Sequence, residues 1–286
     1  MDTQSMHTGY RTLIYFHTAS GNTGWITSQI ARQLRDRGVE VVTRTIAYQE
    51  DTADMENFDM IGFGCPVMGF RPTFSMSDFI DSLPLQQGKP AFIYVTCAGI
   101  SASSLWMLSQ LLNKKGRMVI AAQQFKAEVS WPVARLPGII PDKGRPDARD
   151  IPSIQHFTGT IYEALKSRAE NRPVTPLAVP FAFLNPFSYM GRANKAPYLR
   201  SIMGTKKVIE SRCTRCGICQ KYCASHAISL NPYPQFSSAC TGCWGCYNIC
   251  PESAISTFTG TRGRYTSRTE YLDSTTPGIN NNQSSA

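Results

Sequence analysis

The stretch TLIYFHTASGNTGWITSQIARQLRDRG, residues 12–38, joins an apolar run to an amphipathic segment through a loop rich in hydroxyl groups. TLIYF at 12–16 is typical of a buried strand, and WITSQIARQLRDRG at 25–38 has helical spacing and ends at a glycine. Hydroxyls and backbone N–H groups at the start of a helix can hold a phosphate. The stretch therefore predicts a strand, a phosphate-binding loop and a helix, with an ordinary Ser/Thr helix cap as the alternative for the loop.

The alternation of apolar runs and helical patterns continues to about residue 170. Five short buried strands that alternate with helices predict an α/β fold with a doubly wound, five-stranded parallel sheet. Ligands of such sheets bind beyond the carboxyl ends of the strands. The further strands are predicted at 39–44, 58–64, 90–96 and 117–125, and the further helices at 74–83, 101–116 and 151–170.

The loop T-A-S-G-N-T is neither the G-x-G-x-x-G loop of dinucleotide sites nor a Walker loop. It resembles the FMN phosphate loop of flavodoxins, and residues 10–170 resemble that family in the order of their elements. The loops GFGCPVMGFRP (62–72) and YVTCAGISASS (94–104) follow the third and fourth strands, where flavodoxins hold the isoalloxazine ring. The resemblance implies FMN as a cofactor, bound by Thr18, Ala19, Ser20, Gly21, Asn22, Thr23, Cys65, Pro66, Val67, Met68, Gly69, Phe70, Thr96, Cys97, Ala98 and Gly99.

Glycines and aromatic residues in and near these loops have expected roles toward the ring. Gly62, Gly64 and Gly69 are expected to let the backbone approach it. Phe70 and Trp106 are candidates to cover a face of the ring, with plain core packing as the alternative.

Cys65 and Cys97 fall in the two ring loops. A redox-active thiol pair is one interpretation. The sequence has neither a C-x-x-C pair nor a neighbouring base there, which favours small apolar residues that fill space at strand ends. His17 is expected to pack or to form a hydrogen bond, and no catalytic residue is predicted.

A second pattern, CTRCGICQKYC at 213–223, recurs as CTGCWGCYNIC at 240–250. Eight of the ten cysteines lie in these two runs, each with spacing x2, x2 and x3. Structural zinc sites pair two C-x2-C units across a long gap, so zinc is the disfavoured alternative. The spacing is that of bacterial-type ferredoxins with two [4Fe–4S] clusters, which residues 206–258 resemble.

In that family, the fourth cysteine of each run binds the cluster of the other run. The second run ends in Cys250–Pro251, as in ferredoxins, whereas the first ends in Cys223–Ala224. This departure removes no ligand but is expected to alter the loop around one cluster. His226 is expected to be a turn or surface histidine. The resemblance assigns one cluster to Cys213, Cys216, Cys219 and Cys250, and the other to Cys240, Cys243, Cys246 and Cys223.

Residues 171–205 hold five prolines and the apolar segment LAVPFAFLNPFSYM at 177–190. This segment is too short and too interrupted by proline to span a membrane. It is expected to pack across two domains, with a partner or lipid surface as the alternative. Residues 259–286 are polar and are expected to form a flexible tail.

The chain has 286 residues, 42% of them hydrophobic, and a formal net charge of +9. Neither a membrane-spanning run nor a secretory leader is evident, so a cytoplasmic protein is expected. Basic residues concentrate between 192 and 221. They fit either compensation for anionic cofactors or a docking patch for an acidic protein partner. Nucleic acid is not expected as a partner, because the sequence lacks a recognition motif.

The whole order resembles flavodoxin–ferredoxin fusion proteins of anaerobic prokaryotes. That resemblance implies electron transfer between FMN and two clusters, to or from a redox partner protein. The alternative is a flavin-dependent reductase that acts on a small or lipid-like substrate and uses the clusters as an internal wire. The expected parts are a flavodoxin-like domain at 10–170, a connector at 171–205, a two-cluster ferredoxin domain at 206–258 and a tail at 259–286.

The two functions differ in what covers the flavin. A carrier predicts a flavin edge that faces solvent, whereas a reductase predicts a pocket lined by 66–75, 131–145 and the connector. The loop 130–150 is long for this fold and is expected to act as a lid or a docking loop. Its candidates for binding an anionic group are Arg135, Lys143 and Arg145.

Overall fold

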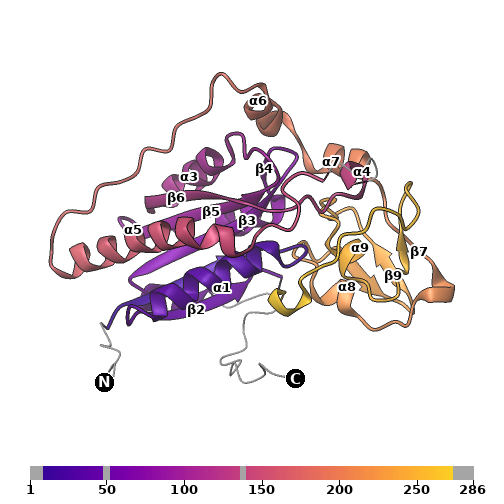
Figure 1. Ribbon diagram of the computed structural model, residues 1–286, viewed down its shortest axis with the longest axis horizontal. Helices are drawn as coiled ribbons and strands as arrows, with labels where there is room; N and C mark the ends of the chain where they lie inside the picture. The colour runs from indigo at the N-terminus through magenta and orange to yellow at the C-terminus, as the bar shows by residue number, and fades with distance from the viewer. Residues whose placement is uncertain (1–8, 48–51, 136–139, 273–286) are drawn as a thin grey trace.

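The computed structural model describes residues 9–47, 52–135 and 140–272. Its first half is built on five parallel strands in the order β2-β1-β3-β5-β6 (Figure 1). This is the flavodoxin-like order of a doubly wound sheet, so the predicted α/β fold is confirmed. The strands are β1 (Arg11–Phe16), β2 (Glu40–Thr45), β3 (Met60–Met68), β5 (Pro90–Cys97) and β6 (Met118–Lys126), and β4 (Arg71–Pro72) pairs antiparallel with the end of β3.

Helices cover both faces of this sheet. Successive strand residues point to opposite faces, and both faces carry apolar side chains that have to be buried. Leu13 and Tyr15 of β1 pack in the core that includes residues of α2 and α3, whereas Ile14 packs in the core that includes residues of α1 and α5. Each strand and helix predicted between residues 12 and 170 is present. The helices are α1 (Asn22–Arg35), α2 (Phe74–Ser82), α3 (Ser104–Lys114) and α5 (Ile151–Ala169), with the 3-10 turn η1 (Ala53–Asn57) before β3.

Gly62 and Gly64 make room for aromatic side chains of the neighbouring strand. A Cβ atom at Gly62 would lie 2.2 Å from the ring of Phe92, and one at Gly64 would lie 2.1 Å from the ring of Tyr94. Both rings belong to the core beneath α1 and α5. The prediction that these two glycines bring the backbone close to a ligand is therefore wrong.

After α5, the connector crosses back over the first domain to two short helices, α6 (Pro186–Ala193) and α7 (Ala196–Met203) (Figure 1). On the way, the Leu177 backbone N–H donates to the carbonyl of Val119 over 2.7 Å. The Asn185 side chain caps α6 by accepting from the Phe187 backbone N–H at 3.0 Å. In the described part of the chain, α6 and α7 included, no helix is long and apolar enough to cross a membrane.

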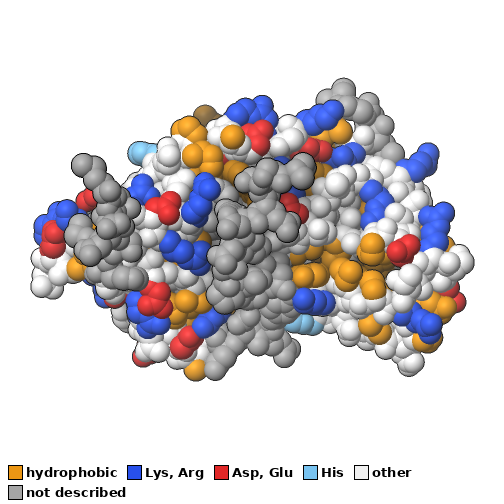
Figure 2. Space-filling model, turned by 60° about the horizontal axis from the view of Figure 1, so that its bottom comes forward, with side chains coloured by type: hydrophobic (Ala, Val, Ile, Leu, Met, Phe, Trp, Pro, Cys, Tyr) orange, Lys and Arg blue, Asp and Glu red, His pale blue; other side chains and the backbone are white. Residues whose placement is uncertain are grey.

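The C-terminal cysteine runs lie in a small α+β unit with its own core of Trp244, Tyr247, Ile228 and Ile255. Figure 2 shows Lys and Arg side chains around the end of the molecule that holds this unit. A short helix carries the third cysteine of each run. The elements are η3 (Glu210–Arg212), α8 (Ile218–Lys221), α9 (Gly245–Ile249), the antiparallel pair β7 (Lys207–Val208) with β10 (Ile255–Ser256), and the antiparallel pair β8 (Ile228–Leu230) with β9 (Pro234–Phe236).

Residues 259–272 of the expected tail pack against the first domain instead of being flexible. The Tyr265 hydroxyl donates to Asn22 Oδ1 at 2.8 Å, and the Arg268 backbone N–H donates to the carbonyl of Ser20 at 3.0 Å. Leu272, just after η4 (Thr269–Tyr271), is buried. The prediction of flexibility is thus wrong for this stretch, because a few anchoring side chains outweigh its polar composition. Residues 273–286 lie outside the described residues.

Candidate functional site

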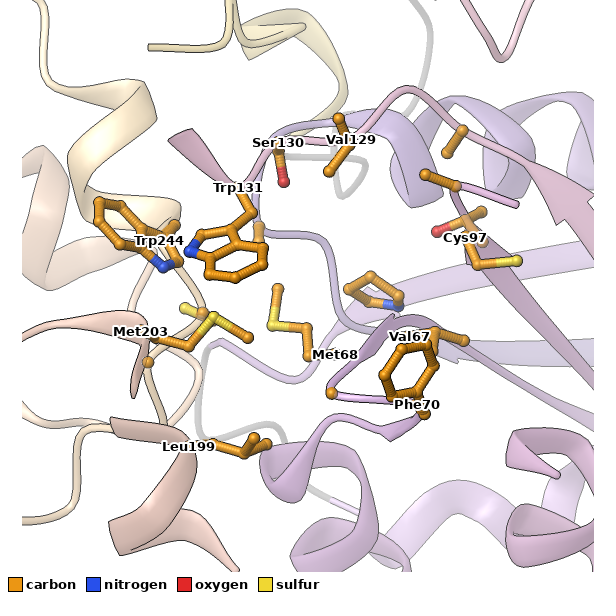
Figure 3. A pocket seen from close by; sticks show the side chains of 18 of the residues that line it. Val67, Met68, Phe70, Cys97, Val129, Ser130, Trp131, Leu199, Met203 and Trp244 are labelled. Atoms are coloured by element: carbon orange, nitrogen blue, oxygen red, sulfur yellow. The ribbon is translucent and has the colours of Figure 1, made fainter. Parts of the chain in front are cut away.

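A cavity of about 300 Å³ lies at the carboxyl ends of β1, β3 and β5, where the first domain, the connector and the C-terminal unit meet (Figure 3). It brings together the three loops that the sequence singled out. Gly21, Cys65 and Gly99 belong to the predicted site but do not line the cavity. The predicted residues that line it are Thr18, Ala19, Ser20, Asn22, Thr23, Pro66, Val67, Met68, Gly69, Phe70, Thr96, Cys97 and Ala98.

One end of the cavity is the hydroxyl-rich loop at the start of α1. Thr18 Oγ1 accepts from the backbone N–H of Gly21 at 3.0 Å, which holds the loop in a tight turn. Gly21 is the N-cap and has a φ of 86°. Glycine has no side chain to cap the first N–H groups of the helix, and those groups have no acceptor within the helix itself. This end therefore suits an anionic group.

The C-terminal segment closes the outer side of the same loop. A Cβ atom on Gly21 would lie 2.1 Å from the carbonyl oxygen of Arg268, so this close approach requires glycine. Thr23 and Thr96 share a hydrogen bond of 2.7 Å between their hydroxyls, which ties the loop to the end of β5. The loop is therefore held from both sides.

The rest of the cavity wall is mainly apolar. Figure 3 shows Val67 and Phe70 on one side and Trp131 and Trp244 on the other, with Met68 between them. Neither indole Nε1 atom has a hydrogen-bond partner among the described residues, although both atoms are buried. A planar aromatic ligand fits such a wall, because aromatic rings pack well against apolar and aromatic side chains.

The connector covers the cavity from the side of the loop after β3. Asn194 Nδ2 donates to the carbonyl of Gly69 at 2.8 Å, and the ring of Phe187 stacks on Phe70 at 4.3 Å. A Cβ atom at Gly69 would lie 2.7 Å from Leu199 of α7. Gly69 therefore allows the connector to approach this loop closely.

Of the two aromatic residues predicted to cover a ring face, only one lies at the cavity. Phe70 lines the cavity, as expected of a residue that covers a ring. Trp106 packs against Phe181 at 5.0 Å, beneath the Arg192 guanidinium, and is not part of the cavity wall. Trp131 and Trp244 were not selected from the sequence, because their approach to the cavity depends on how the connector and the C-terminal unit pack.

The thiols of Cys65 and Cys97 are buried and unsuited to redox chemistry of their own. Burial raises the pKa of each to about 12, so both are neutral near pH 7. Cys97 lines the cavity and Cys65 lies in the core behind it. Both positions fit small apolar residues at strand ends.

His17 holds the loop after β1 against the segment before α2. Its Nδ1 atom lies 3.0 Å from Thr73 Oγ1 and 3.1 Å from Ser75 Oγ. Burial lowers the pKa of His17 to about 4, so the ring is neutral near pH 7. Its role is to position the loop by hydrogen bonding, as expected.

The candidate basic residues of the loop 130–150 do not line the cavity. Arg135, at the end of α4 (Pro132–Arg135), pairs with Glu128, and Arg145 pairs with Asp150 of η2 (Ala148–Asp150). Lys143 is exposed, and none of these three candidates lines the cavity. The expectation that they bind an anionic group there is wrong, because two of the charges are used in internal ion pairs. Residues 136–139 of the loop lie outside the described residues.

The eight C-terminal cysteines fall into two groups of four. The outer group, Cys213, Cys216, Cys219 and Cys250, lines one small cavity in the C-terminal unit. Burial, together with the neighbouring thiols of Cys250, Cys216 and Cys213, raises the pKa of Cys219 to about 11. The Ala254 backbone N–H donates to Cys250 Sγ at 3.3 Å, a contact that would stabilise a thiolate.

The inner group is Cys223, Cys240, Cys243 and Cys246. Burial raises the pKa of Cys243 to about 11, with contributions from the neighbouring thiols of Cys223 and Cys240. Burial raises the pKa of Cys246 well above its ordinary value, and the other three thiols add to this. The Ala227 backbone N–H donates to Cys223 Sγ at 3.4 Å. Each group thus draws its members from both cysteine runs.

The inner group lies directly beside the large cavity. Gly242, Cys243 and Trp244 line that cavity together with the loop after β1. Asn248 of α9 donates to the carbonyl of Ser130 at 3.0 Å, which fixes the C-terminal unit to the loop after β6. In the outer group, Cys216 reaches the surface, whereas the four cysteines of the inner group are all half-buried.

Among the described residues, no three or more His, Cys, Asp or Glu side chains converge as they would around a single metal ion. Zinc requires its ligands within about 2.3 Å of one ion. An iron–sulfur cubane binds each of four thiolates at a different iron, so its ligands stay further apart. The binding of clusters by the two groups of thiols is therefore a proposal.

No protein-family model matches the chain. Among solved structures, it is similar to a flavodoxin from the domain Archaea, with 15% identity and a TM-score of 0.43 over 55% of this chain and 99% of that one. It is also similar to oxidised Flavodoxin 1 from Bacillus cereus, with 18% identity and a TM-score of 0.42 over 54% and 97%. A third is rubredoxin oxygen:oxidoreductase from Desulfovibrio gigas, with 17% identity and a TM-score of 0.43 over 58% and 38%. At these levels, function has to be inferred from the residues of the chain itself.

Proposed function

We propose that the chain is an electron-transfer protein that binds FMN in the large cavity and two [4Fe–4S] clusters at the inner and outer groups of cysteines. The observation that carries this proposal is that Cys243 lines the same cavity as the loop Thr18–Thr23. One wall therefore belongs to a candidate flavin site and also to a candidate cluster site.

The residues present fit FMN at both ends of the cavity. The uncapped start of α1 would bind the phosphate, with Thr18 and Ser20 as further donors. Trp131, Trp244 and Phe70 would contact the ring system of the ligand. When bound, FMN would exchange two electrons and each cluster one, which links two-electron to one-electron transfer.

The order of the sites along the molecule supports a directed route. The inner group touches the cavity, and the outer group shares the C-terminal unit with it and reaches the surface at Cys216. Cys223 and Cys250 each come from one run and lie in the group of the other, so the two groups are held at a fixed separation. The chain would thus conduct between a buried flavin and a partner at the surface.

The surface at the outer group suits an acidic protein partner. Arg212 and Arg215 are both exposed and flank Cys213 and Cys216 in the chain. Positive charge beside an exposed redox group favours encounter with a negatively charged carrier. We therefore propose a separate one-electron carrier protein as the donor or acceptor.

A flavin-dependent reductase is a second candidate, because the connector partly covers the cavity. Met190, Tyr198 and Leu199 of the connector line it, together with Trp131 and the loop after β3. A pure carrier is expected to leave a flavin edge open to solvent, whereas this cover is apolar. A small or lipid-like substrate that accepts electrons from the flavin would use the connector side of the cavity.

The test is made on anaerobically purified protein. About eight iron atoms and about one FMN per chain are expected, with separate flavin and cluster signals in a reductive titration. Zinc in place of iron, or iron without any affinity for flavin, would contradict the proposal. Reduction of an organic acceptor at the flavin without any partner protein would favour the reductase over the carrier.

A further inference from the structure

The connector is the part of the molecule where large apolar side chains face the solvent. Eight of the eleven exposed large hydrophobic residues in the described part of the chain lie between residues 177 and 202. Leu184 is 100% exposed and Phe183 is 72% exposed, so both project from the surface. The others are Leu177, Phe187, Tyr189, Met190, Tyr198 and Ile202. Such a concentration marks a binding surface, because soluble proteins seldom expose contiguous apolar patches.

The inner side of the same connector is firmly attached to the first domain. Leu199 and Ser188 are buried, and Asn194 donates to the carbonyl of Gly69. Arg71 Nη1 donates to the carbonyl of Asn194 at 2.7 Å. Figure 1 shows α6 at an outer edge of the molecule, away from the C-terminal unit. The exposed side chains are therefore presented on a fixed platform.

The charge of the connector has a single sign. Residues 171–205 contain Arg172, Arg192, Lys195 and Arg200 and no Asp or Glu. Arg192 and Lys195 are exposed beside the apolar residues of α6 and α7. The Arg192 guanidinium lies over the rings of Trp106 and Phe181, which fixes its charge at this face.

Exposed aromatic and aliphatic side chains surrounded by cations match the interface of an anionic bilayer. A second copy of the chain fits less well. A symmetric dimer would oppose the same patch on both copies and bring these cations together without an acidic residue of the connector between them. We propose that this face of the connector docks on an anionic phospholipid surface, with Phe183 and Leu184 inserted at the level of the headgroups.

Docking by the connector would place the opening of the large cavity against the bilayer. Met190, Tyr198 and Ile202 are exposed and also line the cavity, so it opens on the connector face. The docking itself depends on neither FMN nor the clusters, so it can fail while the proposed electron transfer holds, and the reverse.

The experiment is flotation of the full-length holoprotein with vesicles of phosphatidylcholine and phosphatidylglycerol, compared with vesicles of phosphatidylcholine alone. We expect binding to the anionic vesicles that weakens with added salt. F183S/L184S is expected to reduce the partition coefficient by about tenfold, because two inserted side chains are lost. The matched control is L85S, which removes a side chain that is 64% exposed outside the connector.

The contribution of the cations is tested with K195E, which is expected to reduce binding to anionic vesicles by about tenfold. The control is K114E, a charge reversal at the end of α3, outside the connector. Binding that is absent with both vesicle types would overturn the proposal, as would equal binding by F183S/L184S and L85S. Sedimentation velocity gives a separate readout. A dimer that dissociates in F183S/L184S, without any vesicle binding by the original protein, would assign the face to a second copy instead.

Discussion

The two groups of cysteines have the same spacing but different surroundings. The position after the second cysteine is Gly217 in the run that begins the outer group and Trp244 in the run that begins the inner group. Both residues cap a short helix in the left-handed conformation, with φ values of 77° and 62°. Glycine adopts this conformation freely, whereas for tryptophan it costs about 1–2 kcal/mol.

The cost at Trp244 is offset by what the indole contacts. Lys206 Nζ lies 4.7 Å from its ring centroid, and Tyr247 meets it edge-on at 4.9 Å. The ring also forms part of the cavity wall. The comparison indicates that the two runs have diverged in role: the outer group keeps a relaxed turn near the surface, and the inner group accepts strain to close the cavity.

Replacing one ligand in each group would have the largest effect. C243S and C216S are each expected to lower the iron content from about eight to about four atoms per chain. C216S is expected to keep electron transfer from the flavin to the remaining inner cluster. C243S is expected to interrupt transfer to the remaining outer cluster, because the inner group lies between the flavin and that cluster. The measurement is iron analysis with rapid-mixing spectroscopy.

Two outcomes would break this comparison. Loss of all iron in both variants would mean that the groups assemble only together. Flavin-to-cluster transfer that is slower in C216S than in C243S would reverse the assignment of inner and outer.

Trp244→Gly tests whether the strained residue is retained for its side chain. Removal of a buried tryptophan costs about 3–5 kcal/mol, and relief of the left-handed strain returns about 1 kcal/mol. The net loss of unfolding free energy is expected to be about 3 kcal/mol, with weaker flavin binding. Thermal unfolding and flavin titration check this.

The matched control is Gly217→Ala in the outer group, where only backbone strain of about 1–2 kcal/mol is added. This variant should bind flavin normally. A Trp244→Gly protein that is as stable as the original, with unchanged flavin affinity, would show that the indole has no such role.

The comparison also shows what the sequence could and could not predict. The loops at 18–23, 66–70 and 96–98 were predictable, because the carboxyl ends of parallel strands meet at one edge of the sheet. Trp131 and Trp244 were missed as cavity residues, because they reach the cavity from segments whose docking no local pattern encodes. Cys250 lines the same small cavity as Cys213, Cys216 and Cys219, and the binding of a cluster by each group stays a prediction.

Two expectations failed for a related reason. Gly62 and Gly64 were assigned to a ligand, but the rings of Phe92 and Tyr94 on the neighbouring strand occupy the space beside them. The segment 259–272 was assigned to a flexible tail because of its composition, but Tyr265 reaches Asn22 across 243 positions of sequence. In both cases the deciding partner is distant in the chain, and a local pattern does not reveal it.

A pH titration tests whether His17 of the first domain is held neutral by burial. His17 has a pKa of about 4 in the folded protein, below its ordinary value of 6.5. As the pH falls, the unfolded chain therefore binds a proton at this histidine before the folded protein does. The free energy of unfolding keeps its maximal contribution from His17 above about pH 6.5 and decreases below that pH. The loss attributable to His17 is expected to be about 2 kcal/mol at about pH 5.

The measurement is chemical denaturation of the original protein and of His17→Gln at several pH values. Gln keeps a polar side chain beside Thr73 and Ser75 but does not titrate, so its profile should be flatter between about pH 6.5 and pH 5. Parallel profiles would mean that His17 is not held neutral by burial.

The smallest expected effect concerns the surface of the outer group. R212Q/R215Q removes two exposed cations beside Cys213 and Cys216, which should slow electron exchange with a negatively charged carrier protein by about threefold at low ionic strength. The difference should vanish at high salt, because screening removes the attraction from both proteins. A neutral small-molecule acceptor should react equally with both, and R32Q on α1 should behave like the original protein. If the substitutions instead shift the reduction potential and leave the salt dependence unchanged, these cations compensate the charge of a cluster rather than attract a partner.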